Sequence, residues 1–338
     1  MARDADWIVR ATYDGRATAP VIGRLPHKLT VFSAPPIIGA MNTMEEAIRK
    51  AAALIEALPY IQSFRGKNFV VKFGGAAMED PATLDCVLDD VVFLQAVGIH
   101  PILVHGGGPE ISREMKARNI QPKFIRGHRV TDQATLEIVR DVLANRINAG
   151  ICKHLEQLGG RPIPFADPSR GLLKGRKRLA RLEGPDGKVE EVDLGFVGDI
   201  TGMDVDAFTR AIQAGQVPIV ASLALGEQGE VLNVNADIAA GHVAVALKAE
   251  KVVFLTDTPG IMTEPKDKNS FAGTLTESHI DDLIRRGVID GGMLPKVEAC
   301  LTALRAGIRK THIIDGRIKH SLLLEIFTDQ GIGTQIIP

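Results

Sequence analysis

The chain has 338 residues, enough for two medium domains or one large α/β domain. Its 40 Lys and Arg residues balance 41 Asp and Glu residues, so no global electrostatic field favours nucleic acid or an anionic membrane. An aromatic fraction of 4% also weighs against a base-stacking platform for single-stranded nucleic acid. Any anion that the protein binds must therefore be held by a local site.

The chain contains three cysteines, Cys86, Cys152 and Cys300, which are far apart and form no CxxC pair. This spacing is unlike a disulfide framework or a zinc site, and it fits a reducing compartment. No apolar run reaches the roughly 18 residues of a membrane span, and the first residues lack the apolar core of a signal peptide. We therefore expect a cytoplasmic protein without a membrane partner.

The first 66 residues precede the regular part of the chain. Thr43 and Glu46 have the spacing of a capping box, which predicts a helix over about residues 43–58 that Pro59 ends. One face of this helix is apolar and needs a partner, either another subunit or the domain that follows. The residues on this face are Ile48, Ala51, Ile55 and Leu58.

From residue 68 onward, short apolar runs alternate with amphipathic segments. The expected strands are Asn68–Phe73, His100–Val104, Val217–Leu223, Lys251–Leu255 and Thr311–Ile314. The expected helices are Pro81–Val97, Glu110–Arg118, Ala134–Gln157 and His279–Arg286. Near-continuous apolar strands separated by helices predict an α/β fold with a mostly parallel central sheet covered on both faces. Ligands bind such sheets at the carboxyl ends of the strands.

One segment, residues 169–197, interrupts this alternation. Asp186-Gly187 stands between two extended runs, which predicts a hairpin turn. A basic cluster precedes the turn, and we interpret it as a solvated face rather than a binding patch, because acidic residues balance it nearby. The cluster consists of Arg170, Lys174, Arg176, Lys177, Arg178 and Arg181.

Two lysines occupy positions that are unfavourable for a cation, one inside an apolar strand and one in the first turn of a helix. Lys72 lies inside an apolar strand just before Gly74 and Gly75. A buried lysine is costly unless its charge meets an anion, and the glycines let backbone N–H groups approach a ligand. Lys296 follows Pro295 in the first turn of a helix, where a cation opposes the helix dipole unless both hold one anion. The plainer alternatives are an edge-strand lysine and a tolerated surface lysine.

A glycine turn follows the second expected strand. The strand runs into Gly106, Gly107 and Gly108, and Pro109 then starts a helix. This arrangement aims free N–H groups and the positive helix end at one place, which is typical of an anion site. The pattern is neither GxGxxG nor GxxxxGK[ST], so Rossmann and P-loop interpretations lose support.

Three further motifs give weaker signals. Asn233, Asn235 and Asp237 stand at a helix start, where capping explains one or two of them. Thr256-Asp257 ends a strand before a Pro-Gly turn that either borders a nucleotide or is a plain turn. Arg129 lies among β-formers and suits bidentate binding of a carboxylate, with a surface ion pair as the alternative.

Taken together, these motifs hold negative charge. They provide two lysines, glycine N–H groups and an arginine, but neither an activated Ser or Cys nucleophile nor a carboxylate-rich metal cage. Such equipment suits phosphoryl transfer, in which catalysis is mostly positioning and electrostatic stabilisation.

In order and spacing, KFGG, VHGGGP, HRVT, NVNAD, TDTPGI and GGMLPKVEA resemble the amino acid kinase superfamily, and within it the N-acetylglutamate kinases, over roughly residues 42–338. The resemblance implies an open αβα sandwich, with residues 1–66 as an N-terminal extension and residues 67–338 as the kinase domain. The N-lobe, about residues 67–240, would bind acetylglutamate, and the C-lobe, about residues 241–338, would bind ATP. The implied reaction is ATP-dependent phosphorylation of the side-chain carboxylate of N-acetyl-L-glutamate in arginine biosynthesis.

The resemblance also implies roles for individual residues. Lys72 and Lys296 would neutralise the transferring phosphoryl group, and Asp237 would hold both lysines. N-acetyl-L-glutamate would be bound by Gly107, Gly108, Arg129 and Asn233, with the arginine on a carboxylate. ATP and its phosphates would contact Gly74, Gly75, Thr256, Asp257, Gly260, Gly292 and Met293. The N–H groups of Gly74, Gly75 and Gly107 would be offered to phosphate oxygens. Mg²⁺ would be held mainly by phosphates and water, without a protein metal site.

The segment Ala57–Ile61 and the end of the chain resemble the arginine-inhibited, hexameric branch of these kinases. In that branch the N-terminal helix interlaces dimers into a trimer of dimers, and L-arginine binds between this helix and the C-terminal segment. The matching positions are Tyr60, His312, Glu325 and Gly331. Glu325 would take the guanidinium, and the alternative is a solvated helix residue. A PII-type regulator binds some relatives, and the residues leave open whether one binds here.

Other interpretations remain open. The chain could phosphorylate acetylaminoadipate or aspartate, or be a catalytically inactive arginine sensor with the same fold. Arg129 with Asn233 favours acetylglutamate, and the presence of both lysines with Asp237 argues against an inactive sensor. The segment Phe165–Arg178 departs from the Ser-Gly-Lys-Asp-Gly-like stretch of most relatives.

Overall fold

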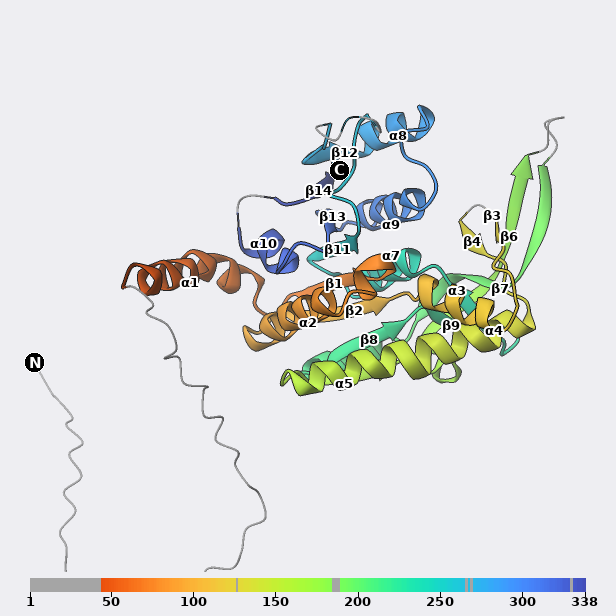
Figure 1. Ribbon diagram of the computed structural model, residues 1–338, viewed down its shortest axis with the longest axis horizontal. Helices are drawn as coiled ribbons and strands as arrows, with labels where there is room; N and C mark the ends of the chain where they lie inside the picture. The colour runs from red at the N-terminus through yellow and green to blue at the C-terminus, as the bar shows by residue number, and fades with distance from the viewer. Residues whose placement is uncertain (1–43, 126, 184–188, 265–266, 268–269, 329–330) are drawn as a thin grey trace, which may run out of the picture. The chain divides into compact units, whose positions relative to one another are not determined.

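The computed structural model describes residues 44–338 except 126, 184–188, 265–266, 268–269 and 329–330 (Figure 1). The α-helices are α1 (Met44–Phe64), α2 (Pro81–Ala96), α3 (Gly108–Ala117), α4 (Gln133–Arg140), α5 (Ala149–Gln157), α6 (Val205–Gln213), α7 (Ala236–Ala246), α8 (Glu277–Arg285), α9 (Met293–Arg305) and α10 (Ser321–Phe327). Short 3-10 turns form η1 (Gly75–Met78) and η3 (Pro168–Arg170), and a π-helix forms η2 (Asp141–Asn148).

An eight-stranded sheet with the order β12-β14-β13-β11-β1-β2-β8-β5 forms the centre of the kinase domain. Every neighbouring pair is parallel except β13 and β14, which confirms the expected mostly parallel sheet. Its strands are β1 (Asn68–Phe73), β2 (His100–His105), β5 (Pro162–Phe165), β8 (Val217–Ala221), β11 (Lys251–Thr256), β12 (Thr274–Thr276), β13 (Thr311–Asp315) and β14 (Thr334–Ile337).

Helices cover both faces of this sheet, and Figure 1 shows α2 and α5 on one side of the central strands and α7 and α9 on the other. Alternate residues of β1 reach the two faces because side chains alternate along a strand. Val70 belongs to the buried core that includes residues of α6, α7, α8 and α9, whereas Phe69 and Val71 belong to the core that includes residues of α2, α3, α5 and α10. The fold is therefore the expected αβα sandwich.

A second group of strands stands apart from the main sheet. Strands β10 (Val231–Val234), β7 (Val189–Met203), β6 (Leu173–Glu183) and β9 (Leu223–Leu225) pair in a closed ring. The long antiparallel pair of β6 and β7 confirms the expected hairpin, although its predicted turn at Asp186-Gly187 lies outside the described residues. Lys174, Arg176 and Lys177 are exposed on it, as the solvated-face interpretation expects. The two remaining strands, β3 (Phe124–Ile125) and β4 (His128–Arg129), form a small antiparallel pair.

Helix α1 does not end at Pro59, so that prediction is wrong. Proline removes one helical hydrogen bond, yet the helix continues to Phe64. Tyr60, Ile61 and Phe64 pack against the core, and the Phe64 ring meets the Phe69 ring edge-on at 5.2 Å between centroids. This packing outweighs the lost hydrogen bond. Thr43 of the predicted capping box lies outside the described residues.

Two other segments differ from the expected elements in a way that matters for the site. The expected strand Val217–Leu223 is divided at Ser222, so that β8 joins the main sheet and β9 joins the ring. The expected helix Ala134–Gln157 is one continuous helical stretch, but its middle third is the π-helix η2. Hydrophobic periodicity does not predict such a change in winding, because it reports which face is buried rather than the hydrogen-bond pattern.

Candidate functional site

Lys72 is buried at the centre of the sheet. Strand β1 lies between β11 and β2, and the Lys72 side chain points to the same face as Val70, toward α7 and α9. Only 6% of the residue is exposed. The edge-strand alternative is therefore wrong, because a central strand places this ammonium group in the interior, where it requires an anionic partner.

Asp237 is that partner, and it also holds the second lysine. Asn235 caps α7 by accepting hydrogen bonds from the N–H groups of Asp237 and Ile238, which places Asp237 in the first turn. One oxygen of Asp237 lies 3.0 Å from Nζ of Lys72 in an ion pair, and the other accepts a hydrogen bond of 2.9 Å from Nζ of Lys296. The structure thus brings together all three predicted catalytic residues, and Lys296 is not a plain surface lysine.

The charges of this cluster are strongly coupled. Burial lowers the pKa of Lys72, although the neighbouring Asp237 carboxylate opposes that effect. Burial alone would raise the pKa of Asp237, but Lys72 and Lys296 outweigh it and hold this pKa below its ordinary value. Two ammonium groups and one carboxylate leave a net charge of about +1 near the carboxyl end of β1. The cluster can therefore accept a further anion.

The glycine turn predicted as an anion site lies beside the cluster. Gly107 is the N-cap of α3 and provides no side chain to occupy the free N–H groups at this helix end. A Cβ atom on Gly107 would lie 2.6 Å from the Ile147 side chain and 2.8 Å from that of Leu143, so any larger residue would have to displace these two buried side chains. Gly74 lies next to the ammonium group of Lys72, which a Cβ atom there would approach to 3.1 Å.

A cavity of about 220 Å³ connects these features. All four residues predicted to bind the acceptor line it, and so do two of the catalytic residues and one of the phosphate glycines. These lining residues are Gly107, Gly108, Arg129, Asn233, Lys72, Asp237 and Gly75. Asn233 comes from β10 and donates a hydrogen bond of 3.1 Å to the Thr131 hydroxyl. The cavity therefore joins a cationic cluster, open N–H groups and polar side chains.

Arg129 is the second buried cation of this cavity. Its residue is 7% exposed, and its guanidinium donates hydrogen bonds to the Gly108 carbonyl at 3.0 Å and to the Ser112 hydroxyl at 2.8 Å. The guanidinium also stacks over the Phe124 ring at 4.7 Å from its centroid. No carboxylate in the described part of the chain pairs with it, so the surface ion pair alternative fails. Sequence analysis missed Ser112 and Phe124, because no motif marks residues that position an arginine from other elements.

The residues predicted to border ATP lie elsewhere on the same edge of the sheet. Thr256 and Asp257 stand at the carboxyl end of β11, next to β1, and Gly292 and Met293 start α9. None of them lines the cavity that contains Arg129. Gly260 has a positive φ of 148°, and a Cβ atom there would lie 2.6 Å from the Phe271 ring. Glycine is therefore favoured at position 260 by backbone conformation and packing alone.

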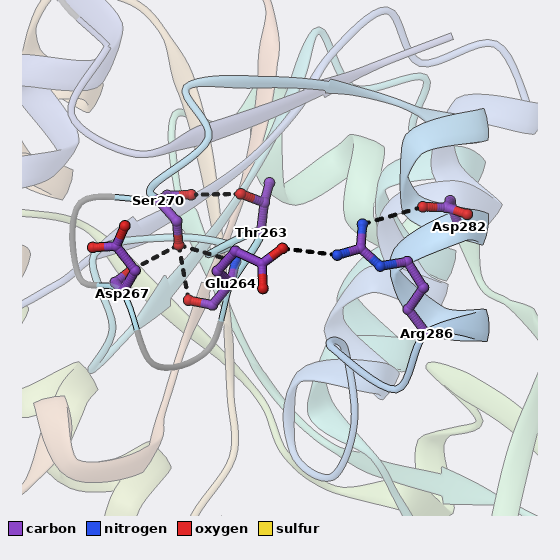
Figure 2. A network of polar contacts seen from close by, with 6 residues as sticks. All are labelled: Thr263, Glu264, Asp267, Ser270, Asp282 and Arg286. Carbon is purple, nitrogen blue, oxygen red and sulfur yellow. Dashed lines mark hydrogen bonds and ion pairs between the residues drawn. The ribbon is translucent and has the colours of Figure 1, made fainter.

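Hydrogen bonds connect residues that follow this turn to one another and to α8, as Figure 2 shows for Thr263, Glu264 and Ser270. The Ser270 carbonyl accepts hydrogen bonds from the Thr263 N–H and hydroxyl, and the Ser270 hydroxyl accepts one from the Glu264 N–H at 3.0 Å. Arg286 then donates to Glu264 at 2.8 Å and to Asp282 at 3.4 Å. These contacts link Glu264 through Arg286 to the last turn of α8.

A second cavity, of about 580 Å³, contains every predicted effector residue: Tyr60, His312, Glu325 and Gly331. Glu325 is 7% exposed, which excludes the solvated-helix alternative. One of its oxygens lies 2.6 Å from Nδ1 of His312, and the other accepts a hydrogen bond of 3.2 Å from the Ile332 N–H. Burial lowers the pKa of His312, although Glu325 opposes this. Burial favours the neutral form of Glu325, but the His312 contact holds the Glu325 pKa below its ordinary value.

Sequence analysis missed three cationic residues that line this second cavity: Lys251, Arg309 and Lys310. Lys251 lines it and lies 5.2 Å from the centroid of the Phe64 ring. Burial lowers the pKa of Lys251, and Glu325 counteracts that effect. The cavity therefore offers both signs of charge, although a lysine at the start of an apolar strand gave no signal by itself.

No group of three or more His, Cys, Asp or Glu side chains in the described ranges is placed to hold a metal ion. Among those same residues, no helix is both long and apolar enough to cross a membrane.

The fold and the lysine–aspartate cluster define a kinase of the amino acid kinase class. The model of the amino acid kinase family matches residues 67–315, which is most of the chain. A solved carbamate kinase from Giardia lamblia bound to AMP-PNP has the same fold, with a TM-score of 0.56 and 14% identity over 80% of this chain and 98% of its own.

Curated relatives identify the group within this family to which the chain is similar in sequence. Acetylglutamate kinase of Pelotomaculum thermopropionicum is 47% identical over 85% of this chain and 97% of its own length. The same enzyme of Carboxydothermus hydrogenoformans is 48% identical over 87% of this chain and 100% of its own length. The chain belongs to the acetylglutamate kinases of the amino acid kinase family.

A more distant structural relative is longer than this chain. It is an N-acetylglutamate synthase from Neisseria gonorrhoeae, complexed with coenzyme A and N-acetyl-glutamate. The likeness has a TM-score of 0.71 and 27% identity and covers 85% of this chain but only 63% of the synthase. This chain therefore matches less than two thirds of that longer protein.

Proposed function

We propose that this chain transfers the γ-phosphoryl group of ATP to the side-chain carboxylate of N-acetyl-L-glutamate, forming N-acetyl-L-glutamyl 5-phosphate and ADP in arginine biosynthesis. Membership of the acetylglutamate kinases supports this reaction. The single observation that carries its mechanism is Asp237, whose two oxygens hold Lys72 and Lys296 at 3.0 Å and 2.9 Å.

The chemistry needs electrostatic help more than proton transfer. A glutamate side-chain carboxylate has an ordinary pKa of about 4.3, so it is already an ionised nucleophile at pH 7. One carboxylate oxygen forms a bond to the γ-phosphorus, the bond from phosphorus to the β–γ bridging oxygen breaks, and ADP leaves with that electron pair. No proton moves. The remaining obstacle is repulsion between two anions, which the positive cluster of Lys72, Lys296 and Asp237 reduces.

The acceptor binds, in this proposal, in the cavity beside the cluster. Arg129 supplies a buried cation without a carboxylate partner among the described residues, and a planar guanidinium binds a carboxylate in bidentate fashion. Asn233 and the Gly107-Gly108 turn add an amide and N–H groups. The synthase relative that is complexed with N-acetyl-glutamate supports this choice of ligand. The α-carboxylate of the acceptor then pairs with Arg129, and the side-chain carboxylate faces the lysines.

ATP binds on the C-lobe side of the same edge. We assign residues 67–240 to an acceptor-binding N-lobe and residues 241–338 to a nucleotide-binding C-lobe, with the reaction between them. Gly74, Gly75 and Gly107 offer N–H groups to phosphate oxygens, and Gly107 also lines the acceptor cavity. The base and ribose lie near the turn after β11 and the start of α9, and the residues on this side are Thr256, Asp257, Gly260, Gly292 and Met293.

Mg²⁺ enters as part of the nucleotide substrate. The described residues contain no acidic group of three for a dedicated ion, and both oxygens of Asp237 already contact lysines. Mg²⁺ tolerates this, because it usually keeps several waters and takes substrate phosphates as ligands. When bound, it neutralises charge on the phosphates.

The substrate assignment is tested by ADP release with four acids: N-acetyl-L-glutamate, L-glutamate, L-aspartate and N-acetyl-aminoadipate. We expect turnover with acetylglutamate and at most about a tenth of that rate with each of the others, since a site built for several polar groups rejects acids that leave them unpaired. A preference for acetylaminoadipate or aspartate would retain the mechanism and reject the substrate. An absence of ADP release with all four acids would favour an inactive arginine sensor.

Regulation by L-arginine belongs to the second cavity in this proposal. The ligand carries a guanidinium and a carboxylate, and the cavity offers the buried carboxylate of Glu325 and the cation of Lys251. Glu325 takes the guanidinium, and Tyr60, His312 and Gly331 complete the site. Because Tyr60 lies on α1 and Glu325 on α10, bound arginine would tie these two helices together.

We further infer a homohexamer built as a trimer of dimers, with α1 in the contact between dimers. The supporting observation is an apolar face of α1 that stays exposed: Leu54 is 65%, Ile55 69% and Leu58 43% exposed. Light scattering of the Ile55→Glu variant tests this, since we expect dimers in place of hexamers. The three free thiols support a cytoplasmic location.

A further inference from the structure

A chain of buried polar groups lies behind the glycine turn, and the reaction described above does not use it. His105 ends β2 and Asn148 ends η2, and both residues are 0% exposed. Nδ2 of Asn148 lies 2.9 Å from Nε2 of His105 and 2.8 Å from the Ile219 carbonyl oxygen. Nδ1 of His105 lies 3.1 Å from the Gly106 carbonyl oxygen.

The partners determine which way each hydrogen bond runs. The Ile219 carbonyl can only accept, so the nitrogen of the Asn148 amide faces it, and this nitrogen can only donate. Nε2 of His105 must therefore accept from Asn148, which leaves the ring proton on Nδ1 to be donated to the Gly106 carbonyl. The Cys152 thiol, 3.7 Å from Oδ1 of Asn148, occupies the other end of the amide. One arrangement of protons therefore satisfies every hydrogen bond in this series of buried polar groups.

The neutral imidazole that this arrangement requires is the form that the interior favours. Burial lowers the pKa of His105 to about 4. A protonated ring would direct an Nε2 proton at the Asn148 amide protons, and the hydrogen bond would be lost.

The Gly106 carbonyl is where this buried chain meets the reaction site. In a trans peptide the carbonyl oxygen and the following N–H point in opposite directions within one plane. Holding the Gly106 oxygen on His105 therefore directs the Gly107 N–H away from His105. Gly107 lines the acceptor cavity, and its N–H donates to no carbonyl or side chain that the structure describes. The Gly106 N–H, which donates to the Phe73 carbonyl at 3.2 Å, fixes the preceding peptide.

The π-helix explains how one helical stretch reaches both sides of the turn. Residues five apart are separated by about 140° around an α-helix axis, whereas the wider winding of a π-helix, with i→i+5 hydrogen bonds, brings them closer to one face. Leu143 and Asn148 are five apart, and η2 contains both. Leu143 and Ile147 therefore pack under Gly107 while Asn148 holds His105. An α-helix would turn Asn148 away from the residues that contact the glycine turn.

We propose that His105 and Asn148 are positioning residues that aim the Gly107 N–H at the phosphoryl group during transfer. This inference rests on the proposed site, in which Gly107 contacts the ligand. Neither residue touches the reacting atoms, so their effect passes through one peptide plane. A donor directed at the charge that develops in the transition state contributes to kcat more than to substrate binding.

Three substitutions test the proposal. His105→Phe keeps an aromatic ring but removes both hydrogen bonds, Asn148→Leu removes the amide, and His105→Asn places an amide donor near the position of Nδ1. Loss of one oxyanion-type donor costs about 10²- to 10³-fold in kcat, so misdirecting one is expected to cost about 10- to 100-fold. We expect this loss in His105→Phe and Asn148→Leu, with both KM values within about threefold of the parent. His105→Asn should recover most of the lost kcat.

The matched control is Asn68→Leu. Asn68 also donates an amide hydrogen bond to a carbonyl, that of Leu247 at 2.9 Å, but at the amino end of β1, away from the site. We expect a lowered Tm and an unchanged kcat. The proposal is overturned if kcat in His105→Phe and Asn148→Leu stays within threefold of the parent, or if His105→Asn loses as much as His105→Phe. If His105→Phe does not fold, kcat of Asn148→Leu is compared with kcat of His105→Asn, and we expect a loss in the first and near-parent activity in the second.

Assays of Lys72→Met and Lys296→Met beside these variants distinguish failure of the proposed site from failure of the positioning role. Near-normal kcat in the lysine variants would reject the proposed site itself. A large loss in the lysine variants without one in His105→Phe and Asn148→Leu would reject only the positioning role.

Discussion

The Lys296 ammonium group donates a hydrogen bond of 2.9 Å to Asp237, and this contact joins the N-terminal ends of α9 and α7. The two helices pack closely, since a Cβ atom on Gly241 of α7 would lie 3.2 Å from the Ala299 carbonyl oxygen of α9. The carboxylate therefore also fixes the distance between the two cations. Loss of either cation changes the charge and the geometry of the same site.

We predict that Lys72→Met and Lys296→Met each lower kcat by about 10²- to 10³-fold, with KM for ATP changed much less, because the lysines act on charge that develops during transfer. Steady-state kinetics on both substrates measures this. Methionine keeps an unbranched side chain, so folding should persist. Lys67→Met is the control, because Lys67 is an exposed lysine just before β1 that pairs only loosely with Glu250 at 4.0 Å. Near-normal kcat in either site variant would refute the assigned role.

Arg129→Lys should raise KM for acetylglutamate by about tenfold or more and leave KM for ATP near its parent value. Lysine keeps the charge but loses the planar fork and the stacking on Phe124. The control is Arg118→Lys, which alters an exposed arginine paired with Glu114 on the surface. An Arg129→Lys enzyme with unchanged KM for acetylglutamate would show that the acceptor carboxylate binds elsewhere.

Glu325→Gln should raise the arginine concentration for half-inhibition by about tenfold or more, because the guanidinium loses a charged hydrogen-bond partner. Glutamine keeps an oxygen for the Ile332 N–H and has nearly the size of glutamate. The comparison is the activity of both proteins over an arginine series, with kcat in the absence of arginine expected to be unchanged. If both proteins respond to arginine alike, or neither responds, this cavity is not the effector site.

The pKa of Lys72 predicts the alkaline limit of the reaction. Because burial lowers this pKa from 10.5, we expect kcat/KM for ATP to fall at a pH below 10.5, where Lys72 loses its charge. The sign for stability is opposite. Between the folded and the unfolded pKa the unfolded chain binds more protons, so this group makes the free energy of unfolding rise with pH across that window. A kcat/KM that stays flat beyond pH 10.5, in enzyme that recovers full activity at pH 8, would contradict this.

The sequence was informative where a residue conflicted with its surroundings. Lys72 in an apolar strand and Lys296 at a helix start both required an anion, and the structure brings them to one carboxylate. Pro59 predicted a helix end that the structure lacks, because local helix propensity does not include the tertiary packing of Phe64. His105 also escaped notice, since its role depends on Asn148, 43 residues away, and on a π-helix that periodicity cannot reveal.

The burial and the contacts of some predicted site residues could not be inferred from their neighbours in the sequence. Glu325 occurs on a short C-terminal helix with no sign in its neighbours that it is buried, and its partner His312 belongs to another element. Arg129 illustrates the same limit. Its charge could be identified from the sequence, but the hydroxyl and ring that hold it come from residues that follow no motif.

In the proposed reaction, the cluster of Lys72, Asp237 and Lys296 supports the transfer of a phosphoryl group from ATP to a side-chain carboxylate. Trapping the acyl phosphate with hydroxylamine tests it most directly, using acetylglutamate and ATP with the parent enzyme and with Lys72→Met and Lys296→Met. We predict ATP-dependent acetylglutamyl hydroxamate from the parent and at most about a hundredth of that rate from each variant. ADP formation without hydroxamate from the parent, or equal hydroxamate from the variants, would contradict the account.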